Sequence, residues 1–167
     1  SWGVSTRLIG AIIMTHGDER GLRLPPQVAP IQVVVLPIAA HKPGVLEGAK
    51  VIADRLTAAG VRVKFDDRDT VSPGWKFNEW EMKGVPVRLE VGPRDLENNQ
   101  VMVARRDTFE KFALPMDGLE GEIEALLASI QKTMFEQARD FRDEHTVEVH
   151  ISRLREKFRG CPDFHIR

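Results

Sequence analysis

Three features that often indicate a function are nearly absent from this sequence. Its 167 residues include one cysteine, Cys161, which excludes an internal disulfide framework and a cysteine-rich zinc site. The formal net charge is -1, so no global field attracts a nucleic acid and any RNA contact must rest on a local patch. The longest apolar runs, residues 8–14 and 33–40, are too short to span a bilayer. We therefore expect a cytoplasmic globular protein with no membrane association.

The chain also lacks a starting methionine, and its histidines lack the spacing of metal ligands. The chain starts at Ser1 without a methionine or a signal segment, and it ends on an alternating pattern that is typical of an unpaired strand. The histidines at positions 16, 41, 145, 150 and 165 show no ligand spacing. These absences favour a fragment, truncated at both ends, that holds no metal.

The sequence does contain an alternation of strand and helix patterns. The β-branched run at 31–38 is typical of a strand covered on both faces, and strand patterns recur at 61–65, 85–91 and 100–106. A helix is predicted from Pro43 to Gly60, and a shorter one over 74–84. Pro86 places the strand at 85–91 either at an edge of the sheet or with the proline at its start. This order predicts an α/β domain with a mixed β-sheet and helices on both faces.

Helical patterns flank this domain on both sides. Residues 4–15 predict a buried helix, and a polar turn and a proline-rich connector follow it. An amphipathic stripe from Leu119 to about Glu144 predicts a long packed helix. A helix over 149–158 and a terminal strand would then begin a truncated α+β segment. The predicted divisions are 1–29, 30–115 and 116–167, and the predicted inward side of the first helix holds Leu8, Ala11, Ile12 and Thr15.

Three stretches together resemble the prolyl-tRNA synthetase family. They are SWGVSTRLIGAIIMTHGDERGLRLPPQVAPIQVVVLPI, VRVKFDDRDTVSPGWKFNEWEMKGVPVRLEVGPRDLENNQ and the helix ending FRDEHT. The combination of DDRD, SPGWKFNEWEMKGVP and GPRDL resembles the archaeal or eukaryote-like type of that family. The resemblance implies a class II anticodon-binding domain, preceded by a remnant of the catalytic domain with its third motif.

The same resemblance carries expectations about activity. The intact parent would be a proline-tRNA ligase that activates proline with ATP and Mg²⁺, transfers it to tRNA(Pro), and dimerises through its missing catalytic domain. The missing motifs would form most of the ATP and proline pockets. The fragment alone is therefore expected to be inactive, to bind no cofactor and to retain recognition of the tRNA(Pro) anticodon.

Arg7 is the candidate catalytic residue. A guanidinium fork binds phosphate oxygens in two places, as an adenylate-forming centre requires, whereas the alternative is a helix-start arginine paired to a carboxylate. The alternative for Arg20, in the GDERG turn, is a solvated loop. For the residues before Arg7 the alternative is ordinary turn and core structure. The resemblance implies ATP contacts from Ser5, Arg7 and Arg20, and a proline pocket that Ser1 and Gly3 line and Trp2 supports.

The RNA-binding candidates lie between residues 66 and 90. Carboxylates can accept hydrogen bonds from guanine N1 and N2, and the proline anticodon is rich in guanine. The alternative for the Asp-rich loop is a solvated turn with a helix N-cap at Ser72. Basic residues interleaved with aromatics are typical of sites for unpaired bases, although Trp80 is favoured as a core residue and Trp75 and Phe77 fit either role. The tRNA-binding candidates are Asp66, Asp67, Arg68, Asp69, Pro73, Lys76, Phe77, Lys83 and Arg88.

Two other functions stay open at this point. A non-catalytic RNA-binding or protein-interaction module could use the anticodon-domain fold, but it would have no reason to carry SWGVSTR. The stretch TVEVHISRLREKF resembles the recognition helix of winged-helix response regulators. The rest of a winged helix is absent from the sequence, so the ligase fragment is the preferred interpretation.

Overall fold

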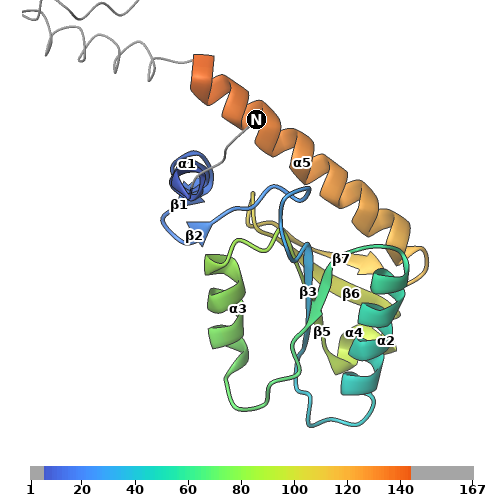
Figure 1. Cartoon of the computed structure of the whole chain (residues 1–167). Coiled ribbons are helices and arrows are strands. Elements are labelled where there is room, and N and C mark those ends of the chain that lie inside the picture. The colour runs from blue at the N-terminus through green and yellow to red at the C-terminus, as the bar shows by residue number, and fades with distance from the viewer. Residues whose placement is uncertain (1–5, 144–167) are drawn as a thin grey trace, which may run out of the picture. The chain divides into compact units, whose positions relative to one another are not determined.

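A computed structural model of the chain describes residues 6–143 (Figure 1). The chain divides into two compact units, Ser1–Lys132 and Thr133–Arg167. The first unit contains the sheet and all the residues of the candidate site. The predicted helix over 149–158, the terminal strand, and Ser1, Trp2, Gly3 and Ser5 lie outside the described residues.

A five-stranded sheet forms the centre of the first unit, in the order β4-β3-β5-β6-β7. The strand β3 (Val33–Pro37) pairs in parallel with β4 (Val63–Phe65) and β5 (Val87–Val91). The antiparallel strands β6 (Gln100–Arg105) and β7 (Lys111–Pro115) extend the sheet beyond β5. The predicted mixed sheet is confirmed, and β7 is a strand that the sequence patterns did not predict.

Helices cover both faces of the sheet, as predicted. Both parallel connections are expected to be right-handed, and they run along the sheet in opposite directions, so their helices lie on opposite faces. On one face α2 (Val45–Ala58) packs through an apolar stripe, and on the other lies α3 (Pro73–Met82) (Figure 1). Trp80 of α3 is 6% exposed and packs with Val34 and Leu36. This contact confirms Trp80 as a core residue.

The start of α3 and the place of Pro86 follow local rules. The Ser72 Oγ accepts a hydrogen bond from the Trp75 amide at 3.3 Å, and Pro73 occupies the first turn, so the predicted N-cap is confirmed. Pro86 directly precedes β5, which is a central strand, so the start-of-strand alternative is correct and the edge alternative is wrong. A short helix, α4 (Pro93–Glu97), lies between β5 and β6, where the sequence patterns predicted no helix.

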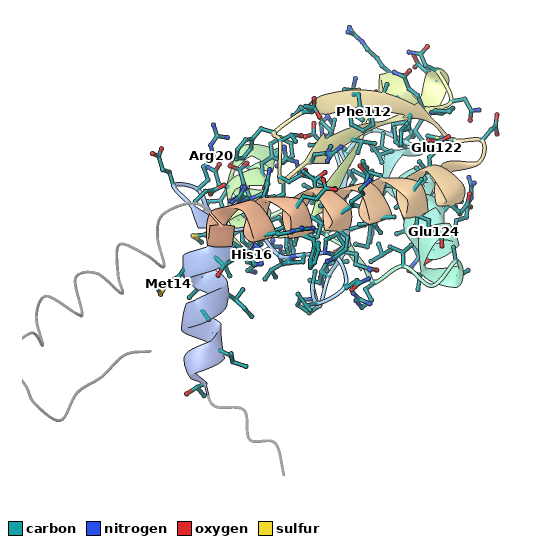
Figure 2. All side chains as sticks on the ribbon, turned by 90° about the horizontal axis from the view of Figure 1, so that it is seen from above. Met14, His16, Arg20, Phe112, Glu122 and Glu124 are labelled. Atoms are coloured by element: carbon teal, nitrogen blue, oxygen red, sulfur yellow. The ribbon has the colours of Figure 1, made fainter. Side chains whose placement is uncertain are left out.

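The first helix, α1 (Arg7–His16), corrects the prediction of a buried helix. Leu8 is 52% exposed, Ile9 61% and Met14 83%, and the predicted inward positions Ala11 and Thr15 are exposed as well. Figure 2 shows the side chains of α1, including Met14, standing away from the sheet. An apolar pattern predicts a helix that prefers burial, but it does not say which surface provides the burial.

Two further elements complete the description. After α1 the chain forms a small antiparallel hairpin, β1 (Gly17–Asp18) and β2 (Gly21–Leu22). The long helix α5 (Leu119–Asp143) agrees with the predicted range, and Glu120 near its start accepts a hydrogen bond from Arg55 of α2 at 2.7 Å. In the stretch between residues 6 and 143, no helix is both long and apolar enough to cross a membrane.

Candidate nucleic-acid interface

A pocket lined by cations opens beside the C-terminal end of α3, on the face of the sheet opposite α2. Val34 and Ala104 of the sheet, together with Trp80, supply apolar lining, and the volume is about 120 Å³. We call it the basic pocket. Its remaining lining residues are Arg20, Glu81, Val85, Arg88, Arg105, Arg106, Phe109 and Lys111.

The register of three strands explains why cations gather here. The residues of β5 alternate, so Val87, Leu89 and Val91 are buried while Arg88 and Glu90 face the other side. Arg88 lies opposite Ala104, and Ala104 lies opposite Lys111. These three therefore form a row across the sheet, and the row borders the pocket because α3 packs over Val34 rather than over β7.

Arg88 and Glu81 face each other across the pocket. The Arg88 Nε donates to Glu90 Oε1 at 3.0 Å, and Lys111 Nζ donates to the same oxygen at 2.8 Å, so Glu90 anchors both cations. The Arg88 guanidinium also lies over the Phe77 ring, 4.3 Å from its centroid. The distance from Arg88 Nη1 to Glu81 Oε2 is 4.0 Å, too long for a hydrogen bond. The Arg88 guanidinium, a hydrogen-bond donor, and the Glu81 carboxylate, an acceptor, therefore face each other without forming a hydrogen bond.

An aromatic ring and a second arginine form the rim. Arg20 Nη1 donates to Glu81 Oε1 at 3.2 Å, and the Arg20 guanidinium lies 4.4 Å from the centroid of Phe109. Phe109 has a φ of 62°, which is uncommon for a bulky residue and costs roughly 1–2 kcal/mol. Strained residues of this kind cluster at binding sites. The turn between β6 and β7 therefore presents a 43% exposed ring at the pocket.

A bidentate ion pair holds the β1–β2 hairpin against the end of α3. The buried Arg106 donates from Nη1 and Nη2 to the two oxygens of Asp18, both at 2.7 Å, and from Nε to the Glu81 carbonyl at 2.8 Å. The Arg106 hydrogen bonds lower the pKa of Asp18 to about 2. A Cβ on Gly21, at φ 125°, would lie 2.6 Å from the Met82 Cα, so only glycine allows this approach.

We expect Asp18→Asn to lower the free energy of unfolding by about 1–2 kcal/mol at pH 7, because the charge-assisted pair with Arg106 is lost. The folded pKa of Asp18 lies below its usual 3.8, so this stabilisation is present above that pH and is lost as the pH falls toward 2. Urea unfolding at pH 7 and at pH 2.5 measures both values. The matched control is Asp54→Asn on the exposed side of α2. Equal stability of the Asp18 variant and the wild type at pH 7 would contradict the role of the pair.

The structure gives Asp66 a role inside the domain. Its carboxylate accepts hydrogen bonds from Arg68 Nε at 2.8 Å and from Trp80 Nε1 at 2.7 Å, and Lys76 Nζ donates to its backbone carbonyl at 3.1 Å. Burial alone would raise the pKa of Asp66, but the hydrogen bonds from Arg68 and Trp80 outweigh it and hold the pKa well below its usual value. Asp66 and Lys76 are 2% and 5% exposed, so both connect the loop to α3 rather than face RNA.

The other predicted RNA contacts fall into two groups. Arg88 lines the basic pocket, and Phe77 borders it through its contact with Arg88. The exposed residues Asp67, Asp69 and Pro73 lie before or at the start of α3. In the same region Arg68 lies 5.5 Å from the centroid of the exposed Trp75, and directly after α3 Lys83 donates to Glu79 at 2.6 Å. The structure therefore does not bring all the predicted candidates to one place.

Arg20, which was predicted to contact ATP in the intact ligase, lines the basic pocket in this structure. Among the three predicted ATP ligands, Arg20 is the one whose side chain the structure describes, and it contacts Glu81 and Phe109. The contact of Arg20 with ATP in the intact ligase stays a prediction. Sequence analysis missed other pocket residues, and the alternation along β5 was the one pattern that pointed to this face. The missed lining residues with a charge or an aromatic ring are Glu81, Arg105, Arg106, Phe109 and Lys111.

Comparisons with known proteins agree with this fold. A family model described as "Anticodon binding domain" matches residues 32–126. The chain is 60% identical to "Proline--tRNA ligase" of Alkaliphilus oremlandii over 89% of this chain and 31% of that protein. It is 62% identical to the protein of the same name from Clostridium novyi, over 87% and 30%, and 56% identical to "Proline--tRNA ligase 2" of Clostridioides difficile, over 98% and 34%. The chain spans about a third of the length of these relatives.

Proposed function

Since this chain belongs to the anticodon-binding-domain family, we propose that its basic pocket binds an unpaired guanine of the tRNA(Pro) anticodon as part of a proline-tRNA ligase. The observation that carries the proposal is that the Glu81 carboxylate and the Arg88 guanidinium face each other across the pocket, with Oε2 and Nη1 4.0 Å apart. Proline codons begin with two cytidines, so the anticodon that reads them carries two guanines.

Guanine is the base whose edges match these two side chains. Its N1 and N2 groups donate hydrogen bonds that the Glu81 carboxylate can accept, and its O6 and N7 atoms accept bonds from an arginine fork such as Arg88. Adenine presents an amino group where guanine has O6, so it would face Arg88 with a donor. The ring of Phe109 offers a stacking surface, and the surrounding cations compensate the charge of the RNA backbone.

The role within a larger ligase rests on the relatives. The match to the Clostridioides difficile protein covers 98% of this chain, so it includes residues before the sheet domain as well as the domain itself. This extent favours a ligase over a non-catalytic RNA-binding or protein-interaction module. This proposal includes four properties of the parent ligase: it binds ATP with Mg²⁺, binds proline, dimerises and lies in the cytoplasm. Most of the ATP and proline pockets would belong to the part of the ligase that this chain does not cover. Within this chain, the candidates remain Ser5 and Arg7 for ATP, with Arg7 the candidate catalytic residue, and Ser1, Trp2 and Gly3 for proline.

The residues predicted to bind tRNA from the loop before α3 have two different roles in this proposal. Asp66 and Lys76 hold the loop and α3 together, and Pro73 starts the helix. The exposed side chains of Asp67, Arg68 and Asp69 remain candidates for nucleotides next to the bound guanine, as does Lys83. Whether the chain is of the archaeal or eukaryote-like type remains a prediction.

The test is the binding of tRNA(Pro) anticodon stem-loops to Glu81→Gln. Stem-loops with one anticodon guanine replaced by adenine or inosine serve as competitors, because inosine lacks only the N2 amino group. We expect the wild type to prefer guanine about tenfold or more, and the variant to lose most of that preference, since glutamine offers one neutral acceptor in place of two charged ones. Fluorescence anisotropy measures each dissociation constant.

The control is Glu47→Gln on α2, which removes a carboxylate from the opposite side of the sheet. It should leave the preference for guanine unchanged. Equal binding of all stem-loops by the wild type would show that the pocket does not read guanine. Loss of affinity for every stem-loop by the same factor in Glu81→Gln would assign Glu81 a structural role instead.

A further inference from the structure

We propose that Arg20 gates the basic pocket: it occupies the Glu81 carboxylate in the RNA-free chain and must leave before guanine can bind there. The inference rests on the proposed guanine-binding function and adds how access to that site is controlled. It also gives Arg20 a role different from the ATP contact that its sequence position suggested.

Arg20 and guanine would compete for one oxygen of the Glu81 carboxylate. Guanine N1 and N2 together need both oxygens of a single carboxylate. Arg20 Nη1 holds Glu81 Oε1 at 3.2 Å, while Oε2 faces Arg88 at 4.0 Å. A guanine that engages both oxygens must therefore displace Arg20, whereas Arg88 can keep its bond to Glu90 and turn its free Nη1 toward the base.

The contest also extends to the aromatic ring. The Arg20 guanidinium lies over the face of Phe109, 4.4 Å from the centroid, in the place where a base would stack. Arg106 approaches the same ring at 5.2 Å, but its hydrogen bonds to Asp18 fix it in the wall of the pocket. Of these two arginines, Arg20 is the one whose contacts permit it to leave.

The surroundings allow the side chain to move while its backbone stays. The Arg20 side chain is 60% exposed, and an exposed ion pair is weak and easily exchanged for water or phosphate. The backbone is held by the bond from the Arg20 amide to Asp18 Oδ1 at 2.9 Å, and Asp18 is held by the buried Arg106. The hairpin therefore positions Arg20 at the mouth of the pocket without locking its guanidinium there.

The experiment compares Arg20→Met with the wild type, using guanine and adenine stem-loops at about 0.3 M salt, where phosphate contacts are largely screened. Methionine keeps an unbranched side chain and removes the fork. We expect the variant to bind the guanine stem-loop about three- to fivefold more tightly, the scale of one lost exposed ion pair, and the adenine stem-loop to gain less, because adenine benefits only from the uncovered Phe109 ring. In the Glu81→Gln background the same substitution should produce a smaller tightening for guanine, because the contested carboxylate is gone and only the Phe109 ring is uncovered.

Two further variants separate the gate from general charge effects. Lys50→Met removes one cation from α2 on the opposite side of the sheet and should change neither binding constant. Arg20→Lys keeps the charge without the planar fork and should tighten guanine binding by an intermediate factor. Thermal unfolding checks that each variant is folded, and exposed Arg20 should tolerate both changes.

The outcomes distinguish the two proposals. If Arg20→Met weakens both stem-loops equally and lowers the salt dependence by about 0.7 in the logarithmic slope, Arg20 is a phosphate ligand and the gate is wrong. An unchanged guanine affinity would also overturn the gate. If the wild type shows no preference for guanine, the proposed function itself fails. A guanine preference that depends on Glu81 but not on Arg20 would reject the gate alone.

Discussion

Asp66→Ala is expected to lower the free energy of unfolding by about 3–5 kcal/mol, because it removes a buried carboxylate that accepts a hydrogen bond from Trp80 and lies beside the buried Lys76. Asp66 is 2% exposed and receives hydrogen bonds from Arg68 and Trp80. Without the carboxylate, the indole N–H of Trp80 is left without its acceptor in the core, and Lys76, 3.6 Å from the same carboxylate, loses its counter-charge. Chemical denaturation measures the change.

Asp66→Asn is the matched variant for this prediction. Asparagine keeps the shape and one acceptor oxygen, so it should cost less than alanine while still losing the charged pair. The folded pKa of Asp66 lies below its usual 3.8, so the charge stabilises the fold above that pH and the stabilisation is lost as the pH falls. The gap between wild type and Asp66→Asn should therefore narrow in acid. A loss below about 1 kcal/mol for alanine would show that the cluster is not a core element.

The sheet and its main helices could be predicted because their patterns are local. The run that forms β3 opens with three valines and continues with Leu36 and Pro37, and all five residues are buried. The N-cap of α3 depends on Ser72 and on the amide of Trp75, three residues away. The edge strand β7 escaped prediction because its residues are exposed or half-buried, so it lacks the apolar signature of the central strands.

The basic pocket could not be predicted because its residues are distant in sequence. Arg88, Ala104 and Lys111 come from three strands, and their row depends on the antiparallel register of β5, β6 and β7. Arg20 reaches Glu81 across 61 positions because the hairpin docks on the end of α3. Spacing along the chain carries no information about such a meeting.

The Asp-rich loop shows a related limit. The sequence treats the three aspartates of DDRD alike, yet the structure buries the first and exposes the other two. The Asp66 amide donates a hydrogen bond to the Val35 carbonyl at 3.1 Å, so this residue continues the pairing of β4 with β3. Its side chain accepts a hydrogen bond from Trp80. Burial of a charged residue is decided by partners that come from elsewhere in the fold.

Arg88→Ala is expected to weaken binding of the guanine stem-loop by about 30- to 100-fold, the scale of one bidentate arginine–guanine contact that also carries charge. Arg88 is better fixed than the exposed cations at the rim, since Glu90 holds its Nε and Phe77 lies under its plane. After the substitution Glu90 still has Lys111 as a partner at 2.8 Å, so the fold should survive. Anisotropy titration and thermal unfolding measure the two properties separately.

Arg88→Lys distinguishes the charge of Arg88 from the shape of its fork. A lysine keeps the cation, so the salt dependence of binding should remain near that of the wild type, but it cannot hold Glu90 and contact two guanine acceptors with one planar group. We therefore expect Arg88→Lys to lose at least half of the binding free energy that alanine loses, and to lose it chiefly against guanine. If lysine restores the full affinity and the full preference for guanine, Arg88 acts through charge alone, and the base is read by Glu81 without a fork on its other edge.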